Sequence, residues 1–414
     1  MLALIVSGIK YVTVFSIVYF CFYIAETKYR VADRNIALNK EHVPGRITMS
    51  QSRVSGHLYI FIGILVISIF AGIRSSSVGV DTSGYPVEFM KYGAISRSYS
   101  ELLRIEPDLM NEYLGALLVF FCSRFTAQPG LLLFFYQFLT VIPVAITAYL
   151  LRDKISIRYS IAVYLFWFFN NSLNMMRQSV SCAFILLGTI ILLLKSKSKI
   201  GALISFVIAV LFHRSGFYGT ILVLSVYMAS KISREKLRVL IYGFILFIPK
   251  LMTSFVLFLY SNGIFKDPHI LYYFDVFFMN RSTNLVGFIN PFSLYSITYL
   301  VACIVLLLMP SLFRYDFFTK VKISHNKDEL VGILTSFNLS GFLIYIVLLL
   351  SMRTMYGNRF SIFFDFFYIV SIPLAINGNR ARLKGLLLIM ILFILWAVWI
   401  IRMGWSGSSL YKIG

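Results

Sequence analysis

Long runs of apolar residues recur along the sequence and are separated by short polar intervals. The clearest runs are Leu2–Tyr23, Leu131–Leu151, Val239–Tyr260 and Leu330–Leu350. A helix needs roughly 20 apolar residues to cross a hydrocarbon core, where its backbone groups must bond one another. The pattern predicts an all-α polytopic integral membrane protein with about 11–13 transmembrane helices. We expect a single transmembrane domain over residues 1–414, with short or re-entrant helices around a cavity open to the outer face.

Polar notches interrupt two of the apolar stretches. Asn170–Ser181 (NNSLNMMRQSVS) separates one pair of apolar runs, and His213-Arg214-Ser215 separates another. A charged group at membrane depth is costly and usually faces a cavity or a partner. The helices on either side of each notch are short. This predicts hairpins whose tips, Arg177 and His213, lie in a wet cavity below the outer membrane surface.

The charges of the loops predict the orientation of the chain. Basic residues concentrate in short loops, so the formal net charge of +21 indicates the positive-inside rule rather than nucleic-acid binding. If every apolar run crossed the membrane, the lysine-rich residues 195–199 would lie outside, contrary to that rule. One run must therefore be re-entrant. Tyr113–Phe125 is the first candidate, because its ~20 Å of helix is too short to span.

Two longer polar intervals are predicted to be external. Residues 74–112 contain six of the 17 acidic residues and form the expected loop over the cavity. Within this loop, Val87–Tyr92 and Leu102–Leu109 have the pattern of interfacial helices. Residues 261–290, which are rich in aromatic side chains, form the second expected loop.

Composition narrows the possible chemistry. The chain is 59% hydrophobic and 13% charged, with a mean hydropathy of +0.82, so no separate soluble domain is expected. The four cysteines lie in apolar runs without metal-ligand spacing, so neither a disulfide nor a metal site is inferred. The sequence has no P-loop, G-x-G-x-x-G, H-E-x-x-H or G-x-S-x-G motif and no paired-Asp motif. This argues against a nucleotide-sugar donor and favours a lipid-linked one.

Four polar clusters recur at the predicted outer ends of spans, at residues 74–85, 170–178, 213–215 and 353–359. Each has a structural explanation when taken alone, because arginines at helix ends snorkel and Asp81 can belong to a turn. The coincidence of all four clusters at one membrane face favours function. A cavity lined by arginine, histidine and one or two carboxylates suits a lipid-linked phosphate or pyrophosphate. Tyrosines of the outer loops are expected to form an interface belt or to stack on sugar rings.

These motifs resemble those of the EpsG-like branch of the Wzy-type polysaccharide polymerases, which make O-antigen or capsule. The resemblance covers roughly the first half of the chain and, more weakly, the last third. The matching pieces are Arg74…Val78-Gly79-Val80-Asp81-Thr82…Tyr85, then Asn174…Met176-Arg177-Gln178 before the small residues Ser179, Ser181 and Ala183, then His213-Arg214-Ser215, and Arg359 before the aromatic span Phe360–Tyr368.

The resemblance implies a metal-independent membrane glycosyltransferase of the bacterial inner membrane, without a cofactor and with a fold similar to the lipid-sugar transferases. It would act at the periplasmic face, among membrane lipids. A growing glycan on undecaprenyl pyrophosphate would be transferred to a lipid-linked repeat unit. A Wzz-type chain-length co-polymerase is the implied partner, and no nucleic acid is involved.

The reaction predicts roles for the polar clusters. Arg177 would stabilise the leaving pyrophosphate, because guanidinium stays charged and binds phosphate with two donors. Asp81 is the first choice for a base on the acceptor hydroxyl, and Glu112 is the second. Further substrate contacts and orienting roles are expected from Arg74, Asn174, Gln178, His213, Arg214 and Arg359.

Two other functions remain open at the level of the sequence. A flippase for lipid-linked oligosaccharides is also polytopic and basic, but such transporters usually show two similar halves, and no internal repeat is visible. An O-antigen ligase or a membrane acyltransferase would share the compartment. An acyltransferase would need an acid near His213, and the sequence places none beside it.

Overall fold

The computed structural model describes residues 2–40, 51–79, 81–82, 84–110, 112–194, 199–232, 243–244, 258, 262, 294–314, 328–350, 354–376, 381–402, 408 and 410–413. Every regular element within these ranges is a helix, and one isolated β-bridge joins Arg74 to Ile413. This confirms the predicted all-α polytopic fold class. Six helices of the described part are long and apolar enough to cross a membrane. The predicted span Val239–Tyr260, the loop 261–290 and Arg353 lie outside the described residues, apart from isolated positions.

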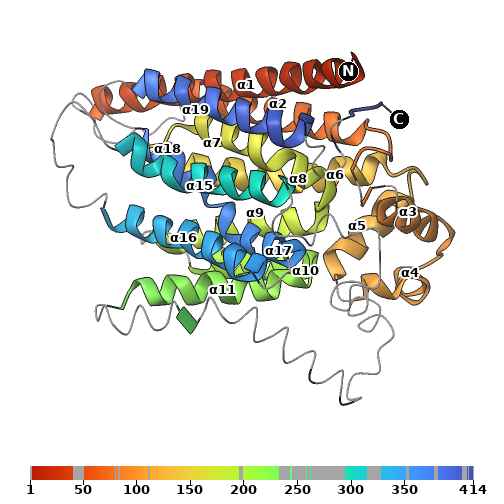
Figure 1. The fold of residues 1–414 in the computed structure, drawn as a ribbon. Helices are drawn as coiled ribbons and strands as arrows, with labels where there is room; N and C mark the ends of the chain where they lie inside the picture. The colour runs from red at the N-terminus through yellow and green to blue at the C-terminus, as the bar shows by residue number, and fades with distance from the viewer. Residues whose placement is uncertain are drawn as a thin grey trace. The chain divides into compact units, whose positions relative to one another are not determined.

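The chain divides into two compact units, Met1–Phe217 with Ile372–Gly414, and Tyr218–Ser371. The first unit carries the candidate spans α1, α2, α6, α9 and α19 and several shorter helices (Figure 1). Its helices are α1 (Leu2–Lys40), α2 (Gln51–Gly72), α3 (Tyr85–Ile95), α4 (Tyr99–Ile105), η1 (Pro107–Leu109), α5 (Tyr113–Ser123), α6 (Gly130–Leu150), α7 (Ile157–Val163), η2 (Tyr164–Phe168), α8 (Phe169–Asn174), α9 (Met176–Leu193), α10 (Lys199–Phe212), α19 (Ala381–Trp396) and η5 (Ala397–Arg402).

Within the first unit, packing proceeds from α1 to α2, α6, α9 and α10 in turn. The expected external loop forms α3 and α4, as the pattern of its two interfacial segments predicted, and α5 follows it. At about 1.5 Å per residue, the 11 residues of α5 are too few to cross the membrane. Since α3 and α5 also pack on α6, this short apolar helix belongs to the wall of the first unit.

The second unit contains α15 (Leu294–Arg314), α16 (Asp328–Leu350), α17 (Thr354–Asp365) and the first half of α18 (Tyr368–Ala375). Helix α11 (Ser215–Ser230) crosses from the first unit to the second after Phe217. Inside the second unit, α16 packs on α17, and the Asn338 amide donates to the Ser371 hydroxyl at 2.6 Å. Both side chains are buried, so this hydrogen bond gives the Asn338 amide nitrogen an acceptor away from water.

A segment after the last span returns to the first unit. The ring of Tyr411 stacks on Phe70, with centroids 4.1 Å apart, and its hydroxyl donates to the Phe70 carbonyl. The Tyr411 N–H donates to the Ser7 hydroxyl at 3.0 Å, and the Ser75 N–H donates to the Lys412 carbonyl at 2.8 Å. Ser408 and residues 410–413 thus hold α1, the end of α2 and the chain after α2 together. We call them the C-terminal strap.

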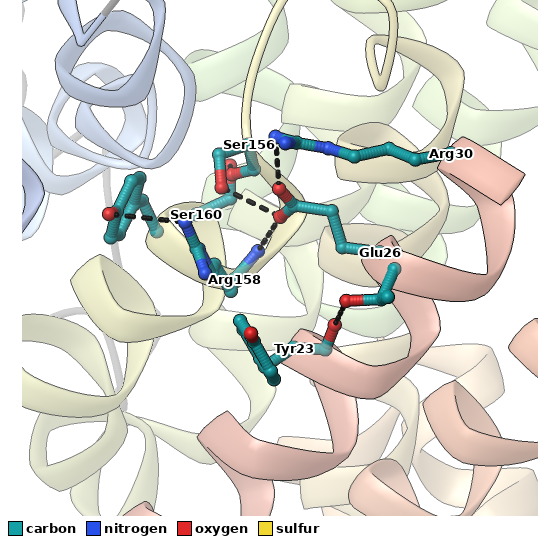
Figure 2. Close-up of polar contacts among 8 residues, drawn as sticks. Tyr23, Glu26, Arg30, Ser156, Arg158 and Ser160 are labelled. Carbon is teal, nitrogen blue, oxygen red and sulfur yellow. Dashed lines mark hydrogen bonds and ion pairs between the residues drawn. The ribbon is translucent and has the colours of Figure 1, made fainter. Parts of the chain in front are cut away.

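Glu26 joins α1 to the beginning of α7, which follows the C-terminal end of α6 (Figure 2). Its buried carboxylate accepts hydrogen bonds from the Ser156 hydroxyl at 2.7 Å, the Arg158 main-chain N–H at 3.2 Å and the Arg30 guanidinium at 2.6 Å. An acidic side chain is favourable here, because the first N–H groups of a helix have no partner within the helix.

Glu26→Ala is expected to destabilise the first unit by about 1–2 kcal/mol, because two donors at the start of α7 lose their acceptor. The Arg30 contact contributes little to this figure, since Arg30 is mostly exposed. Thermal unfolding of the purified protein in detergent measures the change. Glu88→Ala, at an exposed position on α3, is the matched control. Equal melting temperatures for the two variants would contradict the capping role.

Candidate active site

Three side chains from separate elements of the first unit meet at the carboxylate of Glu112. Glu112 precedes α5, Arg177 lies in the first turn of α9, and His213 follows α10. One carboxylate oxygen contacts Nη1 of Arg177, and the other lies 2.5 Å from Nδ1 of His213. The side chain of Glu112 is 2% exposed, whereas those of Arg177 and His213 are 19% and 16% exposed. The carboxylate is therefore the buried centre, and the two basic groups reach the surface of the unit.

The backbone explains why these residues meet. Met175 breaks the helix between α8 and α9 with φ −86° and ψ 54°, so Arg177 begins a new helix. His213 lies in a tight turn before α11, where the Gly216 N–H donates to the His213 carbonyl at 2.8 Å. A Cβ at Gly216 would lie 2.2 Å from the Ser181 hydroxyl of α9. The absence of a side chain there lets the histidine turn approach the helix that carries Arg177.

Electrostatics keep Glu112 ionised. Burial alone would raise the pKa of this carboxyl, but the charges of Arg177 and His213 and the hydrogen bond with His213 outweigh burial and lower the pKa to about 2. Arg214, which is exposed, acts in the same direction. The site therefore contains a permanent anion surrounded by basic groups at neutral pH.

Aromatic rings of α3 hold the guanidinium of Arg177. Its central carbon lies 5.6 Å from the ring centroid of Tyr85 and 5.1 Å from that of Phe89. Such cation–π contacts contribute about 0.5–1 kcal/mol each when partly exposed. Together with Glu112 they restrict the orientation of Arg177, so the predicted external loop supplies one wall of the site.

The loop after α2 folds onto the end of α8. Arg74 is buried and donates to the Leu173 carbonyl at 2.7 Å, and the Asp81 N–H donates to the Asn174 side-chain oxygen at 2.7 Å. Burial lowers the pKa of Arg74 to about 10, so it stays charged at neutral pH. Gly79 has φ +99°, and a Cβ there would lie 2.6 Å from the Thr82 hydroxyl oxygen. Glycine thus permits this tight fold.

The structure brings together most of the predicted site residues. Arg177, His213 and Glu112 share one cluster, and Arg214 is exposed beside it. Gln178 is buried on α9 next to Arg177. Arg74 and Asn174 hold the loop that carries Asp81, and that loop reaches the cluster through a 3.4 Å contact from Arg74 to the Met176 sulfur. Arg359 belongs to the second unit, in α17. The catalytic and binding roles of these residues remain predictions.

Some residues at the site carried no signal in the sequence. Tyr136 of α6 is buried, and its ring lies within the electrostatic range of Arg177 and Glu112. It lies inside a typical apolar span, so no pattern in the sequence distinguishes it from the other residues of that span. Asn170 binds the Trp396 indole N–H at 3.0 Å and the Ser408 hydroxyl at 2.9 Å. Asn170 begins the polar notch that the sequence singled out, and its amide joins the notch to α19 and the C-terminal strap.

No three histidine, cysteine, aspartate or glutamate side chains are grouped for metal binding within the described ranges. Comparison with family models matches residues 57–412 to the EpsG family. No curated protein and no solved structure matches the chain significantly. The family match covers most of the sequence and suggests a polysaccharide polymerase-like, glycosyltransferase-like function. Taken with its apolar helices, this multi-pass membrane protein belongs to the EpsG family.

Proposed function

We propose that this protein is a polysaccharide polymerase of the bacterial inner membrane. It transfers a growing O-antigen or capsule glycan from undecaprenyl pyrophosphate to the terminal sugar of a lipid-linked repeat unit. The transfer takes place at the periplasmic face. Family membership supports the class of reaction. The cluster around Glu112 is the observation that supports a reacting site for a pyrophosphate-linked donor.

The chemistry of the cluster fits a pyrophosphate leaving group. Breaking the sugar–phosphate bond places negative charge on the pyrophosphate, and a fixed cation lowers the energy of that state. Arg177 is held between a carboxylate and two rings and is partly exposed. A guanidinium has five N–H donors, so one contact with Glu112 does not exhaust its capacity for a phosphate. Arg214 adds a second positive charge nearby.

Charge distribution supports the periplasmic orientation. Arg152 and Lys154 lie between α6 and α7, and Arg158 lies in the first turn of α7, against one acid, Asp153, so the positive-inside rule favours the cytoplasm for that end. Glu112 and Arg177 lie toward the opposite end, where α5 and α9 begin. Because α6 is long and apolar enough to span, the two ends fall on opposite sides of the membrane. A Wzz-type co-polymerase is the proposed partner there.

The test uses the full-length protein in detergent with one defined lipid-linked repeat unit. A ladder of products, separated by one repeat each, supports the polymerase. Absence of any ladder from folded protein contradicts it. The same preparation in vesicles distinguishes the alternatives, because a flippase moves the intact substrate across the bilayer and a ligase transfers a single glycan to a different lipid acceptor.

A further inference from the structure

The contact between Glu112 and His213 indicates different chemical roles for the two side chains. We propose that His213 is the general base for the acceptor hydroxyl and that Glu112 is a positioning residue that orients His213. This inference rests on the proposed polymerase function and deepens it. It replaces the sequence-based choice of Asp81 or Glu112 as the base.

The geometry specifies which ring nitrogen carries hydrogen. Oε1 of Glu112 lies 2.5 Å from Nδ1 of His213. An ionised carboxylate accepts hydrogen bonds and cannot donate them, so Nδ1 must be the donor. In the neutral imidazole, Nε2 is then the basic nitrogen. A carboxylate that binds one ring nitrogen in this way orients the ring and stabilises the imidazolium that forms on proton transfer.

Glu112 itself is unsuited to be the base. Its carboxylate is 2% exposed, and both of its oxygens are engaged, one by Arg177 and one by His213. Those interactions favour its ionised form and make it a poor proton acceptor at neutral pH. His213 is 16% exposed, so a sugar hydroxyl can approach the imidazole more readily than the carboxylate behind it.

The step balances without a metal or a redox partner. The acceptor O–H bond breaks and its proton goes to Nε2 of His213, while the oxygen forms a bond to the anomeric carbon of the donor glycan. The bond from that carbon to the pyrophosphate oxygen breaks, and the electron pair leaves with undecaprenyl pyrophosphate. Arg177 stabilises this leaving group, and Glu112 stabilises the protonated His213. The proton later passes to water.

The charged and titratable groups around His213 determine its response to pH. Among the described residues they include Glu112, which contacts His213, and Arg177, Arg214 and Tyr136, which interact with Glu112. At low pH His213 is protonated and cannot accept the hydroxyl proton. This loss of the base produces the acid limb of the pH–rate profile. Loss of the Glu112 charge destabilises protonated His213, so the limb must move to lower pH.

The experiment measures initial polymerisation rates of the full-length protein from about pH 5 to about pH 9. His213→Gln is expected to lower the rate by about 10²–10⁴-fold and to remove the acid limb. Glu112→Gln keeps a hydrogen-bonding side chain and is expected to move the limb by about 1 pH unit downward. Glu88→Gln, at an exposed position on α3, is expected to leave the profile unchanged.

A second measurement is independent of turnover. Nitrogen NMR of ¹⁵N-histidine-labelled protein, with His213 assigned from the His213→Gln spectrum, reports which ring nitrogen is protonated. We expect hydrogen on Nδ1 in the wild type and a weaker preference in Glu112→Gln. Folding of each variant is checked by its melting temperature, and Glu112→Gln provides the test if His213→Gln fails to fold.

The outcomes separate the two levels of the hypothesis. If the wild type polymerises but His213→Gln keeps its rate and its acid limb, the inference is wrong and the polymerase function stands. Loss of the limb in Asp81→Asn instead would identify Asp81 as the base. A lower rate in Glu112→Gln without any shift of the limb would reduce Glu112 to a structural role. If His213 carries hydrogen on Nδ1 but no polymer forms, the polymerase function and the role of His213 as its base both fail, and only the orientation of His213 by Glu112 stands.

Discussion

Arg177→Ala is expected to abolish polymer and leave a product with a single repeat unit. In the proposed reaction the substitution removes the cation that stabilises the leaving pyrophosphate, and loss of one such fixed charge lowers rates by at least about 10²–10³-fold. Arg177→Lys keeps the charge but loses the planar, two-pronged donor arrangement and the stacking on Tyr85 and Phe89. We therefore expect Lys to recover a minor part of the activity. Gel separation of the lipid-linked products measures chain length directly.

A structural side effect must be separated from this chemical one. Removal of Arg177 leaves the buried carboxylate of Glu112 with one basic partner fewer, and an uncompensated buried charge is destabilising by itself. The double variant Arg177→Ala/Glu112→Gln removes both charges and is expected to melt closer to the wild type while staying inactive. Arg104→Ala, at an exposed position on α4, is the control for loss of a cation elsewhere in the unit. Polymer of normal length from Arg177→Ala would refute the assignment.

Deletion of residues 408–414 is expected to lower the melting temperature markedly and to abolish polymerisation. The C-terminal strap contributes the stack of Tyr411 on Phe70 and hydrogen bonds to Ser7 and Tyr11. It also pairs with the backbone at Arg74, on the loop that folds onto α8. Without the strap this loop loses one of its two attachments, so the wall of the active site is no longer fixed.

Single substitutions separate the contributions of individual strap side chains to the free energy of unfolding. Tyr411→Ala removes a buried ring and is expected to cost about 3–5 kcal/mol, whereas Tyr411→Phe removes one hydrogen bond worth about 0.5–1.5 kcal/mol. Lys412→Ala leaves the main-chain contacts intact and alters an exposed side chain, so it should behave as the wild type. Melting curves and polymer length are measured on the same preparations. Wild-type stability of the deletion variant would show that the strap is dispensable.

The fold was predictable because membrane spans are encoded locally. Continuous apolar runs such as Leu131–Leu151 predicted α6 to within one residue at each end. The pattern of residues 74–112 predicted helices where α3 and α4 form, and the shortness of the Tyr113–Phe125 run matches the 11-residue α5. Each of these features depends on residues close together in sequence, where hydrophobic patterning is informative.

The contacts within the site were less predictable, because they join distant residues. Glu112 and His213 are separated by 101 positions, and neither is flanked by a motif that identifies the other. The sequence showed no acid beside His213, yet the fold supplies one. The notch residue Asn174 is predicted to contact substrate, and no pattern in the sequence indicated that its amide oxygen accepts a hydrogen bond from the Asp81 N–H. Asn174 is half-buried, and the loop after α2 provides the hydrogen-bond donor for its side-chain oxygen.

The strap also constrains the order in which the protein assembles. Ser7 and Tyr411 are 404 positions apart, and Arg74 pairs with Ile413. Helices of a membrane protein enter the bilayer as they are synthesised and pack afterwards. The contacts of α1 and α2 with the strap can therefore form only after the intervening spans have been inserted. Contacts of such long range form late, because the chain loses entropy when a large loop closes before the contacts contribute any favourable free energy. We therefore expect the candidate active site to mature late in folding, so that catalytic activity appears after helix insertion in a time-resolved synthesis experiment.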